Sequence, residues 1–135
     1  MADFDFDLFV IGGGSGGVRA ARFAGQRGMR VGMAESKRMG GTCVNVGCIP
    51  KKLYSYAAEY AEGFADARGY GWSIPGEPTL DWDTLKHNRA QSIANLNAIY
   101  EKLMTGAKVD RMQGHASLAD AHTVRVRHGT APPPS

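Results

Sequence analysis

The glycine-rich turn at residues 12–17, Gly-Gly-Gly-Ser-Gly-Gly, constrains the fold more than any other feature of the sequence. It follows a short apolar run at residues 7–11, which favours a buried strand of a parallel sheet. Small residues after the turn favour a helix from Gly16 to about Gly28 that packs close to a sheet. Residues 30–34 favour a second strand that ends at Glu35. This order predicts the opening βαβ unit of a dinucleotide-binding fold.

Each glycine of the pattern Gly-x-Gly-x-x-Gly has a mechanical reason. Gly12 permits a tight turn, Gly14 lets the backbone approach a pyrophosphate, and Gly17 lets the helix pack against the sheet. The N–H groups at the helix N-terminus then face the phosphates. Glu35, 23 residues after Gly12, is placed to accept hydrogen bonds from a ribose. The pattern predicts a nucleotide site without deciding between NAD and FAD, and a plain glycine-rich turn is the alternative.

The two cysteines of the chain, Cys43 and Cys48, are separated by four residues and followed by Lys51 and Lys52. A zinc site would need about two further ligands, and the four histidines supply no obvious pair, so we expect no metal. Cationic neighbours raise the reactive thiolate fraction of a cysteine. The residues favour a couple that alternates between dithiol and disulfide, and two buried free thiols are the alternative.

The composition is ordinary for a soluble domain, with 43% hydrophobic and 21% charged residues in a chain of 135. The net charge of +3 comes from dispersed Lys and Arg, so we expect no nucleic-acid partner. The first seven residues carry three acids and no Lys or Arg, which argues against a secretory or transit signal. The apolar run that follows is too short to span a membrane. We expect a soluble, cytoplasmic protein with no membrane partner.

The remainder of the sequence favours two long helices and two strands. The first helix covers residues 53–67, and Tyr56, Tyr60 and Phe64 on it are interpreted as packing residues. A loop at residues 69–78 precedes a second helix with Asp81 as its N-cap. The apolar face of this second helix carries Ile93, Leu96, Tyr100 and Leu103. Strands are predicted at residues 108–112 and 122–127.

Residues 41–52, Gly-Thr-Cys-Val-Asn-Val-Gly-Cys-Ile-Pro-Lys-Lys, resemble the redox-active disulfide motif of the flavin-dependent pyridine nucleotide–disulfide oxidoreductases. Val44 and the two lysines make the motif similar to that of members that reduce glutathione disulfide. The resemblance implies an α/β, Rossmann-like FAD-binding domain with a parallel sheet, helices and a small β-meander, incomplete at its C-terminal end. Residues 1–127 would be the N-terminal part of that domain, and residues 128–135 a Pro-rich tail.

The resemblance also implies roles for individual residues. The FAD-binding residues would be Gly12, Gly14, Ser15, Gly16 and Gly17 around the pyrophosphate, Glu35 on the adenosine ribose, Thr42 on the phosphates and Ala116 at the adenine. Cys48 would lie next to the flavin, and Cys43, which would also contact the cofactor, would attack the substrate disulfide. Lys51 would lie close to the reactive nitrogen of the flavin.

Three further residues would bind glutathione by the same resemblance, namely Ser15, Arg22 and Tyr100. From pattern alone, an ordinary surface cation is the alternative for Arg22, and a core residue is the alternative for Tyr100. Both alternatives stay open at the level of sequence.

The implied activity is an NADPH-driven reduction of glutathione disulfide by a homodimeric enzyme. Trypanothione, mycothione and dihydrolipoamide are the rival substrates, and a non-catalytic nucleotide-binding or thiol-sensor module is a different class of function. Members of the family are several times longer and carry NADPH and dimerisation domains. We therefore expect part of a longer enzyme, with weak or no FAD binding, poor solubility and no NADPH-dependent turnover on its own.

Overall fold

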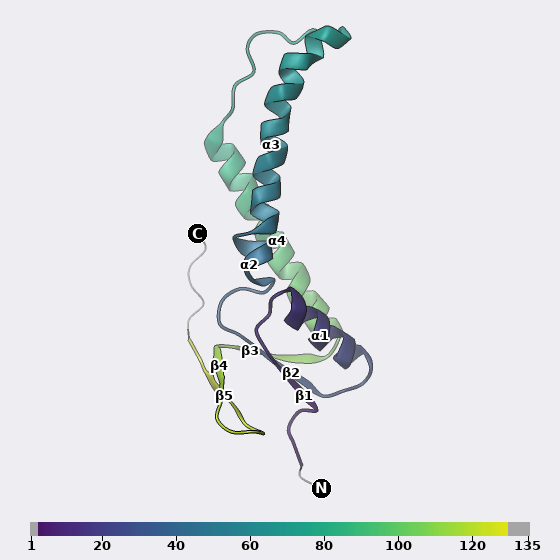
Figure 1. Ribbon diagram of the computed structural model, residues 1–135, viewed down its shortest axis with the longest axis vertical. Coiled ribbons are helices and arrows are strands. Elements are labelled where there is room, and N and C mark those ends of the chain that lie inside the picture. The colour runs from purple at the N-terminus through teal and green to yellow at the C-terminus, as the bar shows by residue number, and fades with distance from the viewer. Residues whose placement is uncertain (1–2, 130–135) are drawn as a thin grey trace.

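A parallel sheet flanked by helices forms the base of the computed structural model, which describes residues 3–129. In chain order the elements are β1 (Leu8–Ile11), α1 (Ser15–Gln26), β2 (Val31–Glu35), α2 (Gly41–Asn45), α3 (Cys48–Ala67), the 3-10 turn η1 (Arg68–Tyr70), α4 (Trp82–Gly106), β3 (Val109–Gln113), β4 (His115–Leu118) and β5 (Val124–Arg127). Figure 1 shows α3 and α4 extending away from the sheet as a long helical pair.

The sheet has the order β1-β2-β3 with all strands parallel, which confirms the predicted βαβ unit. Val31 of β2 pairs with Leu8 on one side and with Val109 on the other. Every residue of β2, the central strand, is buried, and Val31 and Met33 belong to the hydrophobic core. The prediction that the first strand is buried is wrong, since β1 lies at the edge of the sheet and Ile11 is 50% exposed.

Helix α1 begins at Ser15, within the glycine turn, and ends where the sequence predicts. Arg27 is its C-cap, and Gly28 follows with a φ of +84°, a left-handed conformation that favours glycine. At Gly17 an added Cβ would lie 1.9 Å from the carbonyl oxygen of Gly12. Only glycine therefore lets the helix start this close to the strand that precedes it.

The core lies between the sheet, α1 and α4. Met33, Met39 and Met104 are fully buried in it. The predicted apolar face of α4 is confirmed in part, because Ile93 is buried while Tyr100 is only half-buried and packs against the core. Met104, which the predicted face omitted, is the most buried residue of this helix.

The start of the first long helix was predicted wrongly. Helix α3 begins at Cys48 rather than at Leu53, and Pro50 lies in its first turn, where a missing N–H costs no intrahelical hydrogen bond. The prediction also missed the short helix α2 before it. The predicted C-terminal end of α3 at Ala67 is confirmed, although the predicted loop begins within the 3-10 turn η1.

The interpretation of the aromatic residues on α3 as packing residues is wrong. Tyr56, Tyr60 and Phe64 are 46%, 67% and 42% exposed. Tyr60 and Phe64 line an apolar groove between α3 and the segment that leads into α4. Helical spacing alone does not tell whether another element covers a helix face, and here none of the described residues does so fully.

Helix α4 begins at its predicted N-cap. The carboxylate of Asp81 accepts hydrogen bonds from the backbone N–H groups of Asp83 and Thr84, both at 3.0 Å. The hydroxyl of Thr84 also donates to this carboxylate at 2.7 Å, and these hydrogen bonds lower the pKa of Asp81 below its usual value.

The last described strands form a small hairpin. β4 and β5 pair antiparallel, with Ala116 opposite Val126. The predicted strand at residues 122–127 is confirmed from Val124 onward, whereas β4 was not predicted. Of the predicted Pro-rich tail, residues 130–135 lie outside the described residues.

The close approach at Gly17 yields a stability prediction. We expect Gly17→Ala to lower the free energy of unfolding by about 1–3 kcal/mol, because the added methyl would overlap a backbone oxygen that cannot move without shifting the turn. Gly63→Ala is the matched control, since nothing lies within 4 Å of a Cβ there. That control should be neutral or gain up to about 1 kcal/mol. Denaturant unfolding measures both, and equal effects would contradict the prediction.

Candidate redox-active site

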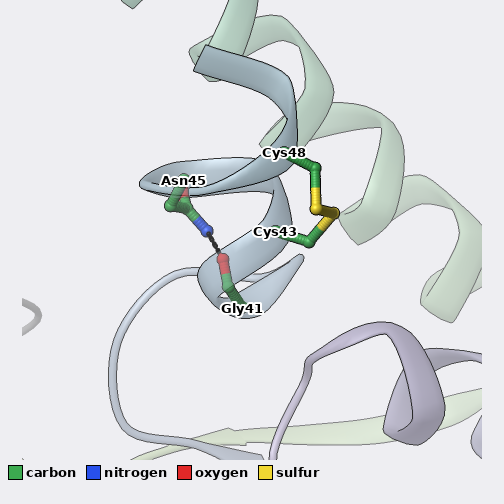
Figure 2. The surroundings of a disulfide bond; sticks show 4 residues. All are labelled: Gly41, Cys43, Asn45 and Cys48. Atoms are coloured by element: carbon green, nitrogen blue, oxygen red, sulfur yellow. Dashed lines mark hydrogen bonds between the residues drawn. A yellow bond between two sulfur atoms is a disulfide. The ribbon is translucent and has the colours of Figure 1, made fainter. Parts of the chain in front are cut away.

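The two cysteines form a disulfide across a break between two helices. Cys43 lies in α2 and Cys48 is the first residue of α3, and Figure 2 shows the bond spanning the junction. Their Cα atoms are 4.6 Å apart. An added Cβ at Gly47 in the junction would lie 2.9 Å from the carbonyl oxygen of Thr42, so the chain folds back tightly between the two sulfurs.

Hydrogen bonds from Asn45, which lies between the cysteines, hold this junction in shape. Its Nδ2 donates to the carbonyl oxygens of Gly41 at 2.8 Å and Met39 at 3.1 Å, and Figure 2 shows the first of these bonds. Asn97 of α4 donates from its Nδ2 to the Oδ1 of Asn45 at 3.0 Å and to the carbonyl oxygen of Met39 at 2.8 Å. The disulfide segment is thus tied to α4 by side-chain amides.

The same segment lies directly against the glycine turn. The N–H of Gly40 donates to the carbonyl oxygen of Gly13 at 2.8 Å. An added Cβ at Gly41 would lie 2.8 Å from the Cα of Gly14, so the two backbones touch. Gly40 and Gly41 both have positive φ values, +96° and +60°, which a residue with a side chain rarely adopts. The structure therefore brings the predicted nucleotide turn and the predicted redox pair together.

Glu35 lies at the end of β2 and is buried, with an exposure of 9%. Its Oε2 accepts a hydrogen bond from the N–H of Gly13 at 2.7 Å, and its Oε1 accepts one from the N–H of Lys37 at 2.6 Å. The carboxylate therefore fixes the glycine turn to the sheet. Because each oxygen has a second lone pair, the ribose contact that the sequence predicts is compatible with these bonds and stays a prediction.

The N-terminus of α1 is open for an anion. Gly14 is its N-cap and provides no side chain to bond the amides of the first turn, which have no intrahelical acceptor. Ser15 and Gly16 are exposed, and a Cβ at Gly16 would meet nothing within 4 Å. Free amides at a helix N-terminus suit a phosphate group, so this turn fits the diphosphate of a dinucleotide.

The other predicted site residues lie on several elements and differ in their exposure. Lys51 is exposed in the first turn of α3, and Thr42 is exposed in α2. Arg22 is half-buried on α1, and Tyr100 packs against the core from α4. Ala116 is half-buried in the β4–β5 hairpin. The binding roles of these residues stay predictions.

Sequence reasoning missed Asn45, Asn97 and Met39. Two signals could have indicated the asparagines. Asn45 stands between the two cysteines, and Asn97 interrupts the apolar face of α4 between Ile93 and Tyr100. A polar residue on a buried helix face usually has a hydrogen-bond partner.

Residues 3–129 offer neither a clustered set of metal ligands nor a long apolar helix. No group of three or more His, Cys, Asp or Glu side chains in this part of the chain is arranged to hold a metal ion. None of its helices combines the length and the apolar composition that a membrane span requires.

Residues 6–131 match the protein family described as pyridine nucleotide-disulphide oxidoreductase, and the chain belongs to this family. It is 47% identical over 126 residues to the glutathione reductase of Burkholderia cepacia, and the matched region covers 93% of this chain and 28% of that protein. It is 41% identical over 133 residues to the chloroplastic/mitochondrial glutathione reductase of Pisum sativum, with 91% and 24% covered. A glutathione reductase of Nostoc sp. is 42% identical over 123 residues, with 91% and 27% covered.

These comparisons confirm the family that the cysteine motif indicates, and its α/β fold agrees with the observed parallel sheet and helices. The chain spans about a quarter of the length of these relatives.

The two cysteines should differ in reactivity once the disulfide is reduced. Cys48 is exposed at the first position of α3, whereas Cys43 is half-buried in α2, so alkylating reagents reach Cys48 more easily. We expect iodoacetamide to label Cys48 several-fold faster than Cys43, as read by mass spectrometry of the two peptides. The variants Cys43→Ser and Cys48→Ser give the separate rates, and equal rates would refute the expectation.

The buried carboxylate of Glu35 gives a second prediction. In Glu35→Gln the side chain has one acceptor oxygen for two backbone N–H groups, so we expect the free energy of unfolding to fall by about 1–3 kcal/mol. Glu59→Gln removes the same charge at an exposed position of α3 and should change it by less than about 0.5 kcal/mol. Denaturant titration compares the two variants, and no difference between them would overturn this reading of Glu35.

Proposed function

We propose that the chain is the flavin-binding and disulfide-bearing part of an NADPH-dependent enzyme that reduces glutathione disulfide. The observation that carries this proposal is the placement of the Cys43–Cys48 disulfide against the glycine turn at the N-terminus of α1. The identity to glutathione reductases from several organisms supports glutathione disulfide over trypanothione, mycothione or dihydrolipoamide as the substrate.

The residues present fit FAD. The diphosphate would lie at the free amides of the first turn of α1, with the adenosine ribose near the carboxylate of Glu35. Thr42 and Lys51 lie on the exposed side of the disulfide segment and would border the cofactor, as would Ala116 at the adenine. When bound, the flavin would supply the electron pair that NADPH provides and that opens the disulfide.

The chemistry of the chain itself is thiol–disulfide exchange. Two electrons and two protons convert the Cys43–Cys48 disulfide into two thiols. The thiolate of Cys43 then attacks one sulfur of glutathione disulfide, forms a mixed disulfide and releases one glutathione thiolate, which takes up a proton. Cys48 attacks the sulfur of Cys43, releases the second glutathione and restores the original disulfide. Arg22, Ser15 and Tyr100 would bind the substrate in this scheme.

The tight junction between the cysteines supports the second half of this exchange. Because the two Cα atoms are 4.6 Å apart, Cys48 reaches the mixed disulfide on Cys43 without a large backbone movement. Cys48 is the first residue of α3 and is exposed, so its sulfur is accessible for this attack. A homodimer and a cytoplasmic location remain proposals for the whole protein, and one relative is chloroplastic/mitochondrial.

The test follows the thiols. The chain reduced with dithiothreitol and freed of it should consume one equivalent of glutathione disulfide and release two equivalents of glutathione per chain. Cys48→Ser should stop at the mixed disulfide on Cys43, visible as added glutathione mass. Cystine and lipoamide are tested in parallel, so that their consumption by the reduced chain can be compared with that of glutathione disulfide. A chain whose disulfide resists reduction under native conditions would overturn the proposal and would leave a structural bridge instead.

A thiol sensor without flavin is the second candidate, because the disulfide segment is complete within this chain. Absorbance distinguishes the two functions. A flavin spectrum in the chain mixed with FAD, with a long-wavelength band after partial reduction, favours the enzyme. A colourless chain with a titratable dithiol favours the sensor.

A further inference from the structure

We propose that Asn97 is a positioning residue for the redox pair, and that it acts through Asn45 to keep Cys43 and Cys48 within bonding reach when the disulfide is open. The inference rests on the proposed redox function of this disulfide. It concerns a residue of α4 that lies 49 positions after Cys48 in the sequence. The observation behind it is the amide chain that joins α4 to the helix junction.

The direction of the hydrogen bonds in this chain is fixed by its end points. The carbonyl oxygens of Gly41 and Met39 only accept, so the amide group of Asn45 that faces them is its NH2 group. The Oδ1 of Asn45 is therefore left to accept from α4, and Asn97 must present its own NH2 group to it. The other hydrogen of Asn97 goes to Met39. Both N–H donors of Asn97 are thus used. No other orientation of the two side-chain amides satisfies both amides and both carbonyl oxygens.

The hydrogen-bonded amides of Asn45 and Asn97 act at the junction between α2 and α3, which separates the two cysteines. Asn45 is the last residue of α2, and the junction at positions 46 and 47 separates it from Cys48. When the disulfide opens, the junction loses its covalent tie and depends on the remaining contacts of α2, among them buried Val44 and the hydrogen bond between Asn45 and Asn97. Asn97 contributes its part of this restraint from a 25-residue helix whose Ile93 and Met104 are buried in the protein. A junction that is already ordered loses less entropy when the disulfide closes.

Removal of the restraint should therefore make the disulfide easier to reduce. We expect Asn97→Leu, which keeps most of the side-chain volume but has no amide, to lower the equilibrium constant for disulfide formation about tenfold. This corresponds to a reduction potential about 30 mV less negative. Asn97→Asp, whose ionised carboxylate can only accept hydrogen bonds, should show a decrease at least as large.

The experiment equilibrates the full 135-residue chain with mixtures of reduced and oxidised dithiothreitol, and quantifies the dithiol by alkylation and mass spectrometry. Asn95→Leu is the matched control because Asn95 is exposed on the same helix, and we expect it to leave the equilibrium unchanged. Circular dichroism and thermal unfolding show whether each variant is folded. If Asn97→Leu does not fold, Asn97→Ser, which keeps one donor, takes its place with a smaller expected shift.

The outcomes separate this inference from the proposed function. A shift in the Asn97 variants with no shift in Asn95→Leu supports the inference. Variants of Asn97 that lose thermal stability but keep the equilibrium of the unsubstituted chain overturn it, because Asn97 would then be only structural. The equilibrium of the unsubstituted chain tests the proposed function itself. A disulfide that dithiothreitol does not reduce in the folded state would contradict a redox role, whatever the Asn97 variants show.

Discussion

The contact between the glycine turn and the disulfide segment is the interaction on which the rest of the structure depends. The Gly13–Gly40 hydrogen bond and the approach of Gly41 to Gly14 place two backbones side by side where no side chain fits. Met39 is buried beneath this contact, and its sulfur lies 2.6 Å from where a Cβ at Gly13 would be. The buried methionine and the small residues therefore hold the glycine turn and the disulfide at a fixed separation.

The carboxyl end of β2 organises this region. The side chain of Glu35 bonds the glycine turn, and its backbone oxygen accepts from the N–H of Gly114, which leads into β4. Three segments that are distant in sequence thus meet at the last residue of the central strand. In open α/β sheets, ligands bind at the carboxyl ends of the strands. The free amides of α1 and the disulfide lie around this same end, which is the physical basis for assigning both to one site.

The sequence predicted the features that depend on local pattern. The βαβ unit, the stop at Gly28 and the Asp81 cap are each determined by a few neighbouring residues, and the structure confirms them. The features that were missed depend on contacts across the chain. The start of α3 at Cys48 is set by the fold-back at Gly47, and the pairing of Asn45 with Asn97 joins residues 52 positions apart. The exposure of Tyr60 was missed because spacing gives the face of a helix and not what covers it.

The position of Cys48 as the first residue of α3 has a mechanical consequence. A helix of 20 residues is about 30 Å long, so a small rotation at its first turn becomes a displacement of several ångströms at its far end. In the proposed reaction the sulfurs would exchange electrons at the end of α3 about which such a rotation occurs, while the distal half of the helix carries the exposed side chains of Tyr60 and Phe64. Buried Pro50 in the first turn of α3, and the asparagine amides that hold α2, would keep that end of the helix fixed during the exchange.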